Sequence, residues 1–438
     1  MRDAIALSGW KDTFNVPERI GSGTCSSRIT QGGTNSFPDR RLRILFVASH
    51  PVQYQSPLFQ RFAAHPQLDM HVAYCSLRGA EAAHDPEFDA TVQWDVPLLS
   101  GYPWTRIPNK GSGSESFLGL RNTGLWDIIR RGNYDAVISF VGYVRSTFWI
   151  ALTAAKISKT AFLFGTDAIT LVPRNGRAWK HMVKKILWPW LFQLADQVIV
   201  PSSGTRDLMF SLGLKQERVT VTPYTVDNDW WARESEKVNR SVVRASWTAS
   251  PTDTVILFCG KLQPWKRPLD LLRAFAKADL SNAMLVFAGE GPLRPQIESE
   301  ANALGIGSRI RILGFVNQSA LPAVYTASDL MVLPSEYEPF AVVVNEAMCC
   351  GCPVAASDHV GAVRDLVAPV CPEFVYPCGD VEALAGLLRR ALVDRANLKS
   401  IGHASIAHMR TWSPEKNIAA TITAIEIAVS RVSTRLLV

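Results

Sequence analysis

The sequence predicts an α/β protein made of two Rossmann-like, doubly wound domains that face a cleft. Three observations favour this fold. Apolar segments of strand length alternate with helical segments, the alternation runs through two successive series, and 438 residues are enough for two or three domains. Because alternating buried strands and helices form parallel βαβ units, each series predicts a parallel sheet with helices on both faces.

The first series predicts an N-terminal domain over residues 41–228. It begins with RLRILFVASH, an apolar run that ends at a polar loop. The expected strands are 41–50, 70–75, 134–140, 160–165 and 197–202. The expected helices are 57–64, 147–158, 177–195 and 204–213, and 218–227 closes the domain. Residues 1–40 are rich in Gly, Ser, Thr and Asn without a period, so we expect a flexible N-terminal tail.

The second series predicts a C-terminal domain over residues 229–410. Its expected strands are 255–262, 283–292, 309–316, 329–335 and 353–358. Its expected helices are 267–278, 292–304, 319–327 and 380–393. The Ser-Pro-Glu sequence at 413–415 is typical of a helix start, so residues 411–438 are expected to form a C-terminal helix. Ligands of such sheets bind at the carboxyl ends of the strands.

Two glutamates, Glu338 and Glu346, stand eight positions apart in SEYEPFAVVVNEAMCCGCPVAASD. Pro339 has no N–H to leave unsatisfied and therefore suits the start of a helix, which Gly351 and Pro353 would end. Residues 339–342 would then present backbone N–H groups that attract an anion. Each glutamate taken alone is also explained by a favourable helix dipole or a solvated helix face.

This string resembles the E-x7-E signature of retaining glycosyltransferases with the GT-B fold, in particular glycosyltransferase family 4, the group 1 type. The resemblance implies that Glu338 lies near the donor sugar as a catalytic residue and that Glu346 bonds the nucleotide ribose. It also implies that the backbone N–H groups of Phe340, Ala341 and Val342 face the diphosphate.

Three further fragments match that family in the same order. CGKLQPWKRPLDLLRAF resembles the loop in which two cations hold the diphosphate; Lys266 matches the family's lysine, and Lys261 stands where the family more often has arginine. FAGEGP, which contains Gly291, resembles a loop near the nucleotide, and GFV, which ends at Val316, resembles the part that frames the base. The C-terminal helix resembles the family helix that crosses back onto the first, acceptor-binding domain.

The first domain matches the family less well. ISFVGY, at 138–143, lacks the histidine that the family often has there. The ionisable groups at strand ends are His50 and Asp167, which we interpret as candidates for acceptor binding or proton transfer. The alternatives are a loop histidine bonded to backbone and an N-cap for the following turn.

These residue types suit transfer from a nucleotide-diphosphate-sugar co-substrate. A departing diphosphate needs positive charge, which Lys261, Lys266 and the N–H groups supply, and an oxocarbenium-like transition state needs the negative charge of Glu338. We therefore predict a metal-independent retaining hexosyltransferase that uses no cofactor and acts on an envelope, exopolysaccharide or lipid-linked acceptor. The alternatives are a nucleotide-sugar epimerase of similar fold and a non-catalytic sugar-nucleotide-binding protein.

Composition bears on location and partners. No apolar run reaches the length of a spanning helix, the first residues lack a signal peptide's apolar core, and the eight cysteines are scattered, so we expect a cytosolic protein with reduced thiols. The net charge of +7 comes without a nucleic-acid-binding signature.

One segment combines cations with aromatic residues. Lys180, His181, Lys184 and Lys185 precede ILWPWLF. One interpretation is peripheral docking to anionic lipid on the inner face of the cell membrane. The other is a packing helix whose tryptophans face the core of the first domain.

Overall fold

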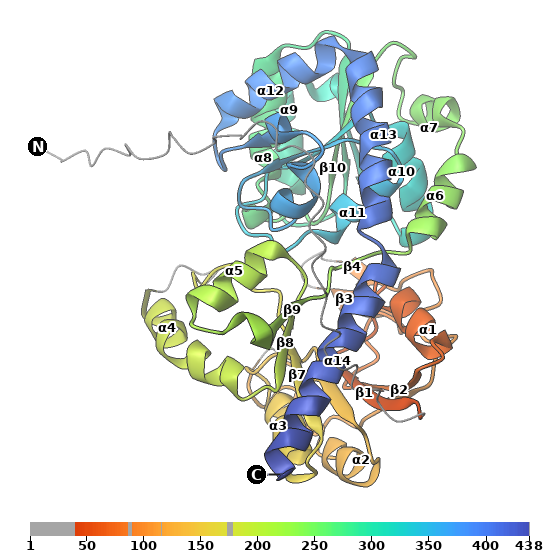
Figure 1. Ribbon diagram of the computed structural model, residues 1–438. Helices are drawn as coiled ribbons and strands as arrows, with labels where there is room; N and C mark the ends of the chain where they lie inside the picture. The colour runs from red at the N-terminus through yellow and green to blue at the C-terminus, as the bar shows by residue number, and fades with distance from the viewer. Residues whose placement is uncertain (1–39, 86–89, 115, 173–177, 438) are drawn as a thin grey trace, which may run out of the picture. The chain divides into compact units, whose positions relative to one another are not determined.

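The computed structural model describes residues 40–85, 90–114, 116–172 and 178–437. The predicted tail, residues 1–40, lies outside this part of the chain except for its last residue. Within the described residues the strands form two parallel sheets and one short antiparallel pair. The larger elements are shown in Figure 1.

The first sheet has seven parallel strands in the order β5-β2-β1-β6-β7-β8-β9. Their bounds are β1 Leu42–Ala48, β2 Leu68–Tyr74, β5 Trp104–Arg106, β6 Ala136–Ser139, β7 Ala161–Gly165, β8 Gln197–Val200 and β9 Val219–Val221. The accompanying helices are α1 Ser56–Ala64, α2 Leu125–Arg131, α3 Ser146–Ile157, α4 Ala178–Gln193 and α5 Ser203–Ser211.

Helices cover both faces of this sheet. Side chains alternate between the two faces along each strand, and apolar side chains on both faces need to be buried. Phe46 of β1 contacts Phe59 and Phe62 of α1, with ring centroids 5.2 Å apart in both pairs. Its neighbours Leu45 and Val47 point the other way and join the buried cluster that contains residues of α2 and α3. The first sheet is therefore buried on both sides, as the continuous apolar runs predict.

The second sheet has six parallel strands in the order β12-β11-β10-β13-β14-β15. Their bounds are β10 Thr254–Cys259, β11 Ala283–Ala288, β12 Ile310–Gly314, β13 Leu330–Leu333, β14 Val354–Ser357 and β15 Val375–Tyr376. The main helices of this half are α8 Pro268–Ala278, α9 Arg294–Ala303, α10 Leu321–Ala327, α11 Val342–Cys349, α12 Val381–Val393 and α13 Arg395–Thr411.

The chain forms two Rossmann-like domains, so the predicted α/β class is confirmed. Each expected strand and helix of both series is present with shifted ends. The sequence reasoning missed the antiparallel pair β3 Ala83–Asp85 and β4 Ala90–Val92, and also β5, α2, α13, α6 Asn228–Glu236 and α7 Arg240–Ser246. The division of the chain near residues 228 and 410 stays a prediction.

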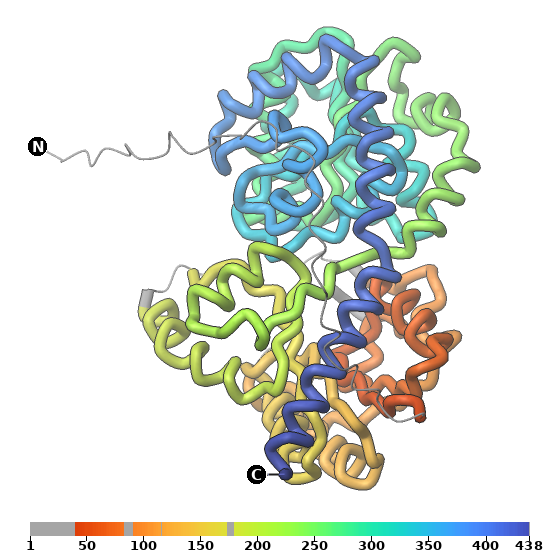
Figure 2. Tube along the Cα trace, in the orientation of Figure 1, coloured from red at the N-terminus to blue at the C-terminus, as the bar shows by residue number. Residues whose placement is uncertain are grey.

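The last helix, α14 Pro414–Leu437, packs on the first sheet although it follows the second series. It contacts β7, β8 and β9, and its residue Arg435 pairs with the buried Asp196 at 2.7 Å. Figure 2 shows the chain path from α13 into this helix. Within the described residues, no helix is both long enough and apolar enough to span a bilayer.

Candidate functional site

The predicted donor residues follow neighbouring strands of the second sheet. Lys261 follows β10, Gly291 follows β11, Val316 follows β12 and Glu338 follows β13. Because these strands are parallel, the four residues stand at the same edge of the sheet. This edge is where ligands of doubly wound sheets bind.

The loops after β10 and β11 are hydrogen-bonded to each other. The Gly260 N–H donates to the Ala288 carbonyl at 3.0 Å, and the Leu262 N–H donates to the Glu290 carbonyl at 2.9 Å. A side chain at Gly291, which has a φ of +152°, would place its Cβ 2.7 Å from the Leu262 carbonyl oxygen. Glycine is therefore needed at Gly291 for this close approach, which fixes the backbone around Lys261.

Lys266 and Glu338 form an ion pair between Lys266 Nζ and Glu338 Oε2. Lys266 ends the short 3₁₀ turn Pro264–Lys266, and the Trp265 carbonyl accepts the Glu336 N–H at 2.8 Å. The two segments that carry the predicted cation and the predicted carboxylate are thus tied together by main chain as well as by side chains.

The structure corrects the predicted start of the helix that follows Glu338. The helix begins at Val342, not at Pro339, and Ala341 adopts a left-handed backbone with a φ of +81°. This conformation costs a non-glycine residue about 1–3 kcal/mol and is often found at functional sites. No side chain of the described residues caps α11, and its first turn carries no acid. Its N–H groups therefore favour an anion.

Contacts on both sides hold this strained turn. The Gly361 N–H donates to the Glu338 carbonyl and the Ala362 N–H donates to the Phe340 carbonyl, both at 2.9 Å. Phe340 is buried; its ring lies 5.4 Å from that of Tyr224 and 6.4 Å from that of Trp412. The site turn is therefore packed against the residues that lead into α6 and α14.

Glu346 is a buried carboxyl on α11, 8% exposed. It accepts a hydrogen bond from the Tyr325 hydroxyl at 2.8 Å, and burial raises the pKa of Glu346 to about 7. Tyr325 also lies 3.3 Å from the sulfur of Cys259, the last residue of β10. Glu346 thus lies close to the β10 loop that carries Lys261, where the family resemblance expects the nucleotide.

In the first half, Asp167 follows β7 and His50 follows β1. The His50 ring nitrogen Nδ1 lies 2.9 Å from the Ser49 hydroxyl. Part of the Asp167 side chain is exposed to solvent. Protein atoms around the rest of it reduce its solvation, and this desolvation raises the pKa of Asp167. The described residues 168–172 form no helix that Asp167 could cap.

Sequence reasoning missed two tyrosines beside Asp167. Burial, with the nearby Asp167 charge as a smaller cause, raises the pKa of Tyr54 and that of Tyr224. Their ring centroids are 5.5 Å apart. Tyr54 lies in the loop after β1 that the sequence had singled out only for His50. Tyr224 had no motif to mark it.

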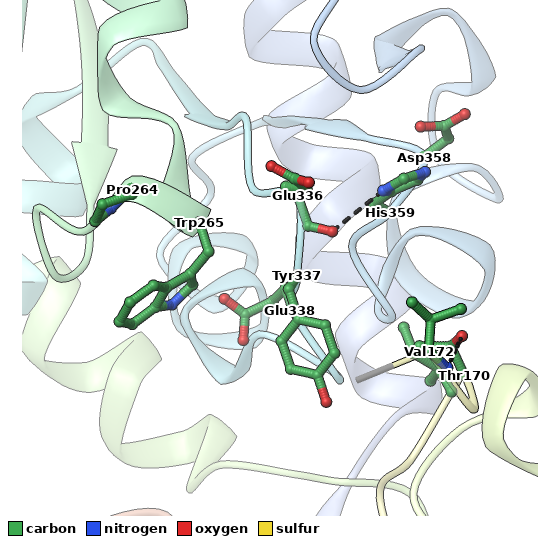
Figure 3. Close-up of a pocket in the computed structure, with 10 residues that line it drawn as sticks. Thr170, Val172, Pro264, Trp265, Glu336, Tyr337, Glu338, Asp358 and His359 are labelled. Atoms are coloured by element: carbon green, nitrogen blue, oxygen red, sulfur yellow. Dashed lines mark hydrogen bonds between the residues drawn. The ribbon is translucent and has the colours of Figure 1, made fainter. Parts of the chain in front are cut away.

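A pocket of about 680 Å³ opens beside Glu338, shown in Figure 3. It is lined by Ile169, Thr170, Val172, Pro264, Trp265, Glu336, Tyr337, Glu338, Asp358 and His359. In Figure 3, Glu338 lies between the rings of Trp265 and Tyr337. Of the predicted site residues, Glu338 lines this pocket. The pocket is also lined by Trp265, which precedes Lys266 in the sequence, and by Tyr337, which precedes Glu338; the sequence did not predict a role for either aromatic residue.

The described residues contain no group of three or more histidine, cysteine or acidic side chains that could hold a metal ion.

Two family models match the chain. Residues 239–408 match the model described as "Glycosyl transferases group 1", and residues 66–230 match the model described as "Glycosyltransferase Family 4". Together the two models cover more than half of the 438 residues.

Curated relatives align over shorter stretches. The uncharacterized glycosyltransferase MJ1607 of Methanocaldococcus jannaschii is 34% identical over 41% of this chain and 47% of its own. The 2-deoxystreptamine glucosyltransferase of Streptomyces kanamyceticus is 32% identical over 50% of this chain and 56% of its own. The D-inositol 3-phosphate glycosyltransferase of Nocardia farcinica is 31% identical over 50% of each chain. The chain thus spans about half the length of these relatives.

Solved structures share the fold across most of the chain. Anabaena Alr3699/HepE, solved with UDP and glucose, is 18% identical with a TM-score of 0.65 and covers 90% of this chain and 100% of its own. A glycosyltransferase from Rickettsia africae has a TM-score of 0.68 at 16% identity, with 89% and 99% covered. WaaG, involved in lipopolysaccharide biosynthesis, has a TM-score of 0.60 at 17% identity, with 86% and 99% covered. At these identities the likeness shows the GT-B fold.

Proposed function

We propose that this chain, which belongs to the group 1 glycosyltransferases and has their GT-B fold, transfers a sugar from a nucleotide-diphosphate donor to an envelope, exopolysaccharide or lipid-linked acceptor and retains the anomeric configuration. The observation that carries the proposal is the meeting of Lys266 and Glu338 at the carboxyl edge of the second sheet, beside the N-terminus of α11. The UDP and glucose held by the Anabaena protein of the same fold support a nucleotide-sugar donor.

The donor would be held by opposite charge and by hydroxyl contacts. Lys261, Lys266 and the first N–H groups of α11 balance the diphosphate, and the Glu346 carboxylate accepts hydrogen bonds from the ribose hydroxyls. With these groups in place the donor needs no metal to neutralise its charge. Glu338, released from Lys266 when the diphosphate binds that lysine, lies next to the anomeric carbon.

The reaction exchanges one bond at the anomeric carbon for another. The bond from that carbon to the diphosphate oxygen breaks, and the acceptor hydroxyl oxygen forms a new bond on the same face. The acceptor proton passes to the departing diphosphate. Glu338 stabilises the positive charge that develops on the sugar ring, and the lysines stabilise the leaving group. Asp167 and His50 remain candidates for holding the acceptor hydroxyl.

The test incubates the purified chain with a panel of nucleotide sugars and a membrane extract and follows products by mass spectrometry. We expect a sugar-extended product and free nucleoside diphosphate. An isomerised donor would indicate the epimerase instead, and donor binding without turnover would indicate a non-catalytic binding protein.

A matched pair of variants locates the activity. Glu338→Gln should abolish most turnover, whereas Glu382→Gln, which changes an exposed glutamate of α12 that pairs with Lys277, should retain it. Equal activity of the two variants would place the chemistry elsewhere.

We also infer a cytoplasmic enzyme that works at the inner face of the cell membrane. A lipid-linked acceptor would lie at that surface, and helix α4, which carries three lysines and no acidic residue, supports contact with it.

A further inference from the structure

The outer face of α4 is unusually apolar for a surface. Six large apolar side chains of this helix are exposed: Trp179, Met182, Val183, Ile186, Leu187 and Trp190. Their exposed fractions run from 41% at Val183 to 71% at Trp190. The spacing of three, four and seven residues places them on one stripe. We call these six residues the outer face of α4; no other helix of the described residues exposes as many.

The opposite side of α4 already packs on the first sheet. Trp188 is 5% exposed and donates its indole N–H to the Tyr143 hydroxyl at 2.7 Å, while Phe192 stacks on Phe164 at 5.5 Å. Trp188 therefore faces the core, as the packing interpretation expects, but Trp179 and Trp190 do not. Because Trp188 and Phe192 on the inner side already pack α4 against the domain, the outer face is available for a partner.

The charges of α4 indicate which partner fits. The helix carries Lys180, Lys184 and Lys185 and has no acidic residue. Lys185 is exposed beside the outer face, whereas Lys184 lies over the Trp188 ring at 4.9 Å. An apolar stripe with tryptophans and flanking lysines matches a bilayer surface, where rings enter the boundary of the acyl chains and cations meet anionic headgroups.

We propose that the outer face of α4 docks on the surface of a bilayer that contains anionic lipid. The helix starts six residues after Val172, which lines the pocket beside Glu338, so the chain between them spans at most about 22 Å. Docking would hold that pocket near the membrane. This link to a lipid-linked acceptor rests on the proposed function, whereas the docking itself does not.

The test is co-sedimentation of the full chain with vesicles, without donor or acceptor. Phosphatidylcholine vesicles are compared with vesicles of equal parts phosphatidylcholine and phosphatidylglycerol, at low and high salt. We expect binding to the anionic vesicles that weakens at high salt. Lys185→Ala should weaken it about fivefold. Ile186→Glu and Trp190→Glu should each weaken it at least about tenfold because they place a charge in the buried stripe.

Val242→Glu is the matched control. Val242 is 64% exposed and Ile186 is 62% exposed, and glutamate is tolerated in the first turn of α7. This control should bind as wild type does, and all of these variants should keep their melting temperature because the changed side chains are exposed.

Three results would overturn the proposal. The first is that wild type sediments with neither kind of vesicle. The second is that Ile186→Glu and Val242→Glu bind the anionic vesicles equally. The third is a lipid-free dimer that Ile186→Glu dissociates, which would assign the outer face of α4 to a second copy of the chain. Since no donor is present, each of them leaves the transferase proposal standing, and a failure of sugar transfer would leave the docking result standing.

Discussion

The ion pair between the side chains of Lys266 and Glu338 is what a donor bound at the proposed site must displace. Both side chains are mostly buried, and the ammonium that would bind the diphosphate is held by the carboxylate that would face the sugar. A bound diphosphate would take over Lys266 and leave Glu338 beside the sugar. Donor binding and the placement of the Glu338 carboxylate beside the sugar would therefore be one event.

Lys266→Ala should weaken nucleotide binding. The lost charge-assisted contact corresponds to about 1.5–3 kcal/mol, and Glu338 is left to repel the diphosphate. Calorimetry with UDP and GDP measures the change in affinity. The control is Lys277→Ala, which removes an exposed lysine in the last turn of α8 that pairs with Glu382. The double variant Lys266→Ala, Glu338→Ala should bind more tightly than Lys266→Ala alone. Unchanged affinity in Lys266→Ala for every nucleotide that wild type binds would remove Lys266 from the site.

Glu346 should make stability depend on pH. Its pKa of about 7 lies above the ordinary value of 4.5, so the folded state holds more protons than the unfolded chain between those values. Its contribution is fully present below pH 4.5, and the free energy of unfolding falls as pH rises toward 7. Glu346→Gln lacks this dependence, so its stability relative to wild type should grow from pH 5 to pH 8. Urea unfolding of both proteins from pH 5 to pH 8 measures this difference in the free energy of unfolding. A difference that stays constant across this range would contradict the raised pKa of Glu346.

At the element scale, Gly361 holds the turn that leads into α11. A Cβ at Gly361 would lie 1.9 Å from the Pro339 carbonyl oxygen, so Gly361→Ala must push the Glu338–Phe340 segment away. We expect lower kcat and a loss of about 1–3 kcal/mol in stability. Gly386→Ala, inside α12 with only the end of Arg390 nearby, should be neutral or stabilising. Turnover and thermal unfolding check both; wild-type behaviour of Gly361→Ala would mean that this turn tolerates displacement.

Element boundaries show how far the sequence could predict the fold. The apolar runs predicted the long strands and helices, because buried strands in parallel sheets read as continuous apolar segments. Helix α13 was missed because its buried residues Leu398, Gly402, Ser405 and Met409 include two small ones, so no apolar period marks it. Gly402 is small for a reason that only the fold reveals: its Cβ would lie 2.3 Å from the Gly351 carbonyl oxygen.

Contacts within the candidate site could be predicted where a motif has fixed spacing and not elsewhere. The family pattern pointed to Lys266 and Glu338, and the structure brings these two side chains into contact, while their roles stay predictions. The helix start at Pro339 was wrong, because Ala341 takes a left-handed backbone that no propensity rule predicts for alanine. Tyr54 and Tyr224 come together from distant parts of the chain, so only the packing of the fold places them beside Asp167.

In the whole molecule, the carboxyl edge of the second sheet is connected to the first sheet through aromatic residues. Trp412 stacks on Phe340 and donates its indole N–H to the Tyr224 carbonyl at 2.8 Å, just before α14 packs on β7, β8 and β9. The turn at α11 and the path of the chain between the two sheets therefore share the same aromatic contacts.

Activity of the whole enzyme should survive chelation. In the proposed function, Lys261, Lys266 and the N-terminus of α11 would supply the positive charge that a divalent ion would otherwise give to the diphosphate. We expect the same rate of sugar transfer with EDTA as with added Mg²⁺ or Mn²⁺. Complete loss of transfer in EDTA, restored by either ion, would contradict metal independence.

A crystal structure of the chain with UDP or GDP would show directly whether Lys266 and Glu338 form the donor site. We expect the diphosphate to contact Lys266 and the first N–H groups of α11, Glu338 to be no longer paired with Lys266, and the ribose hydroxyls to reach Glu346. A nucleotide bound elsewhere on the chain, with the Lys266–Glu338 pair intact, would contradict this expectation.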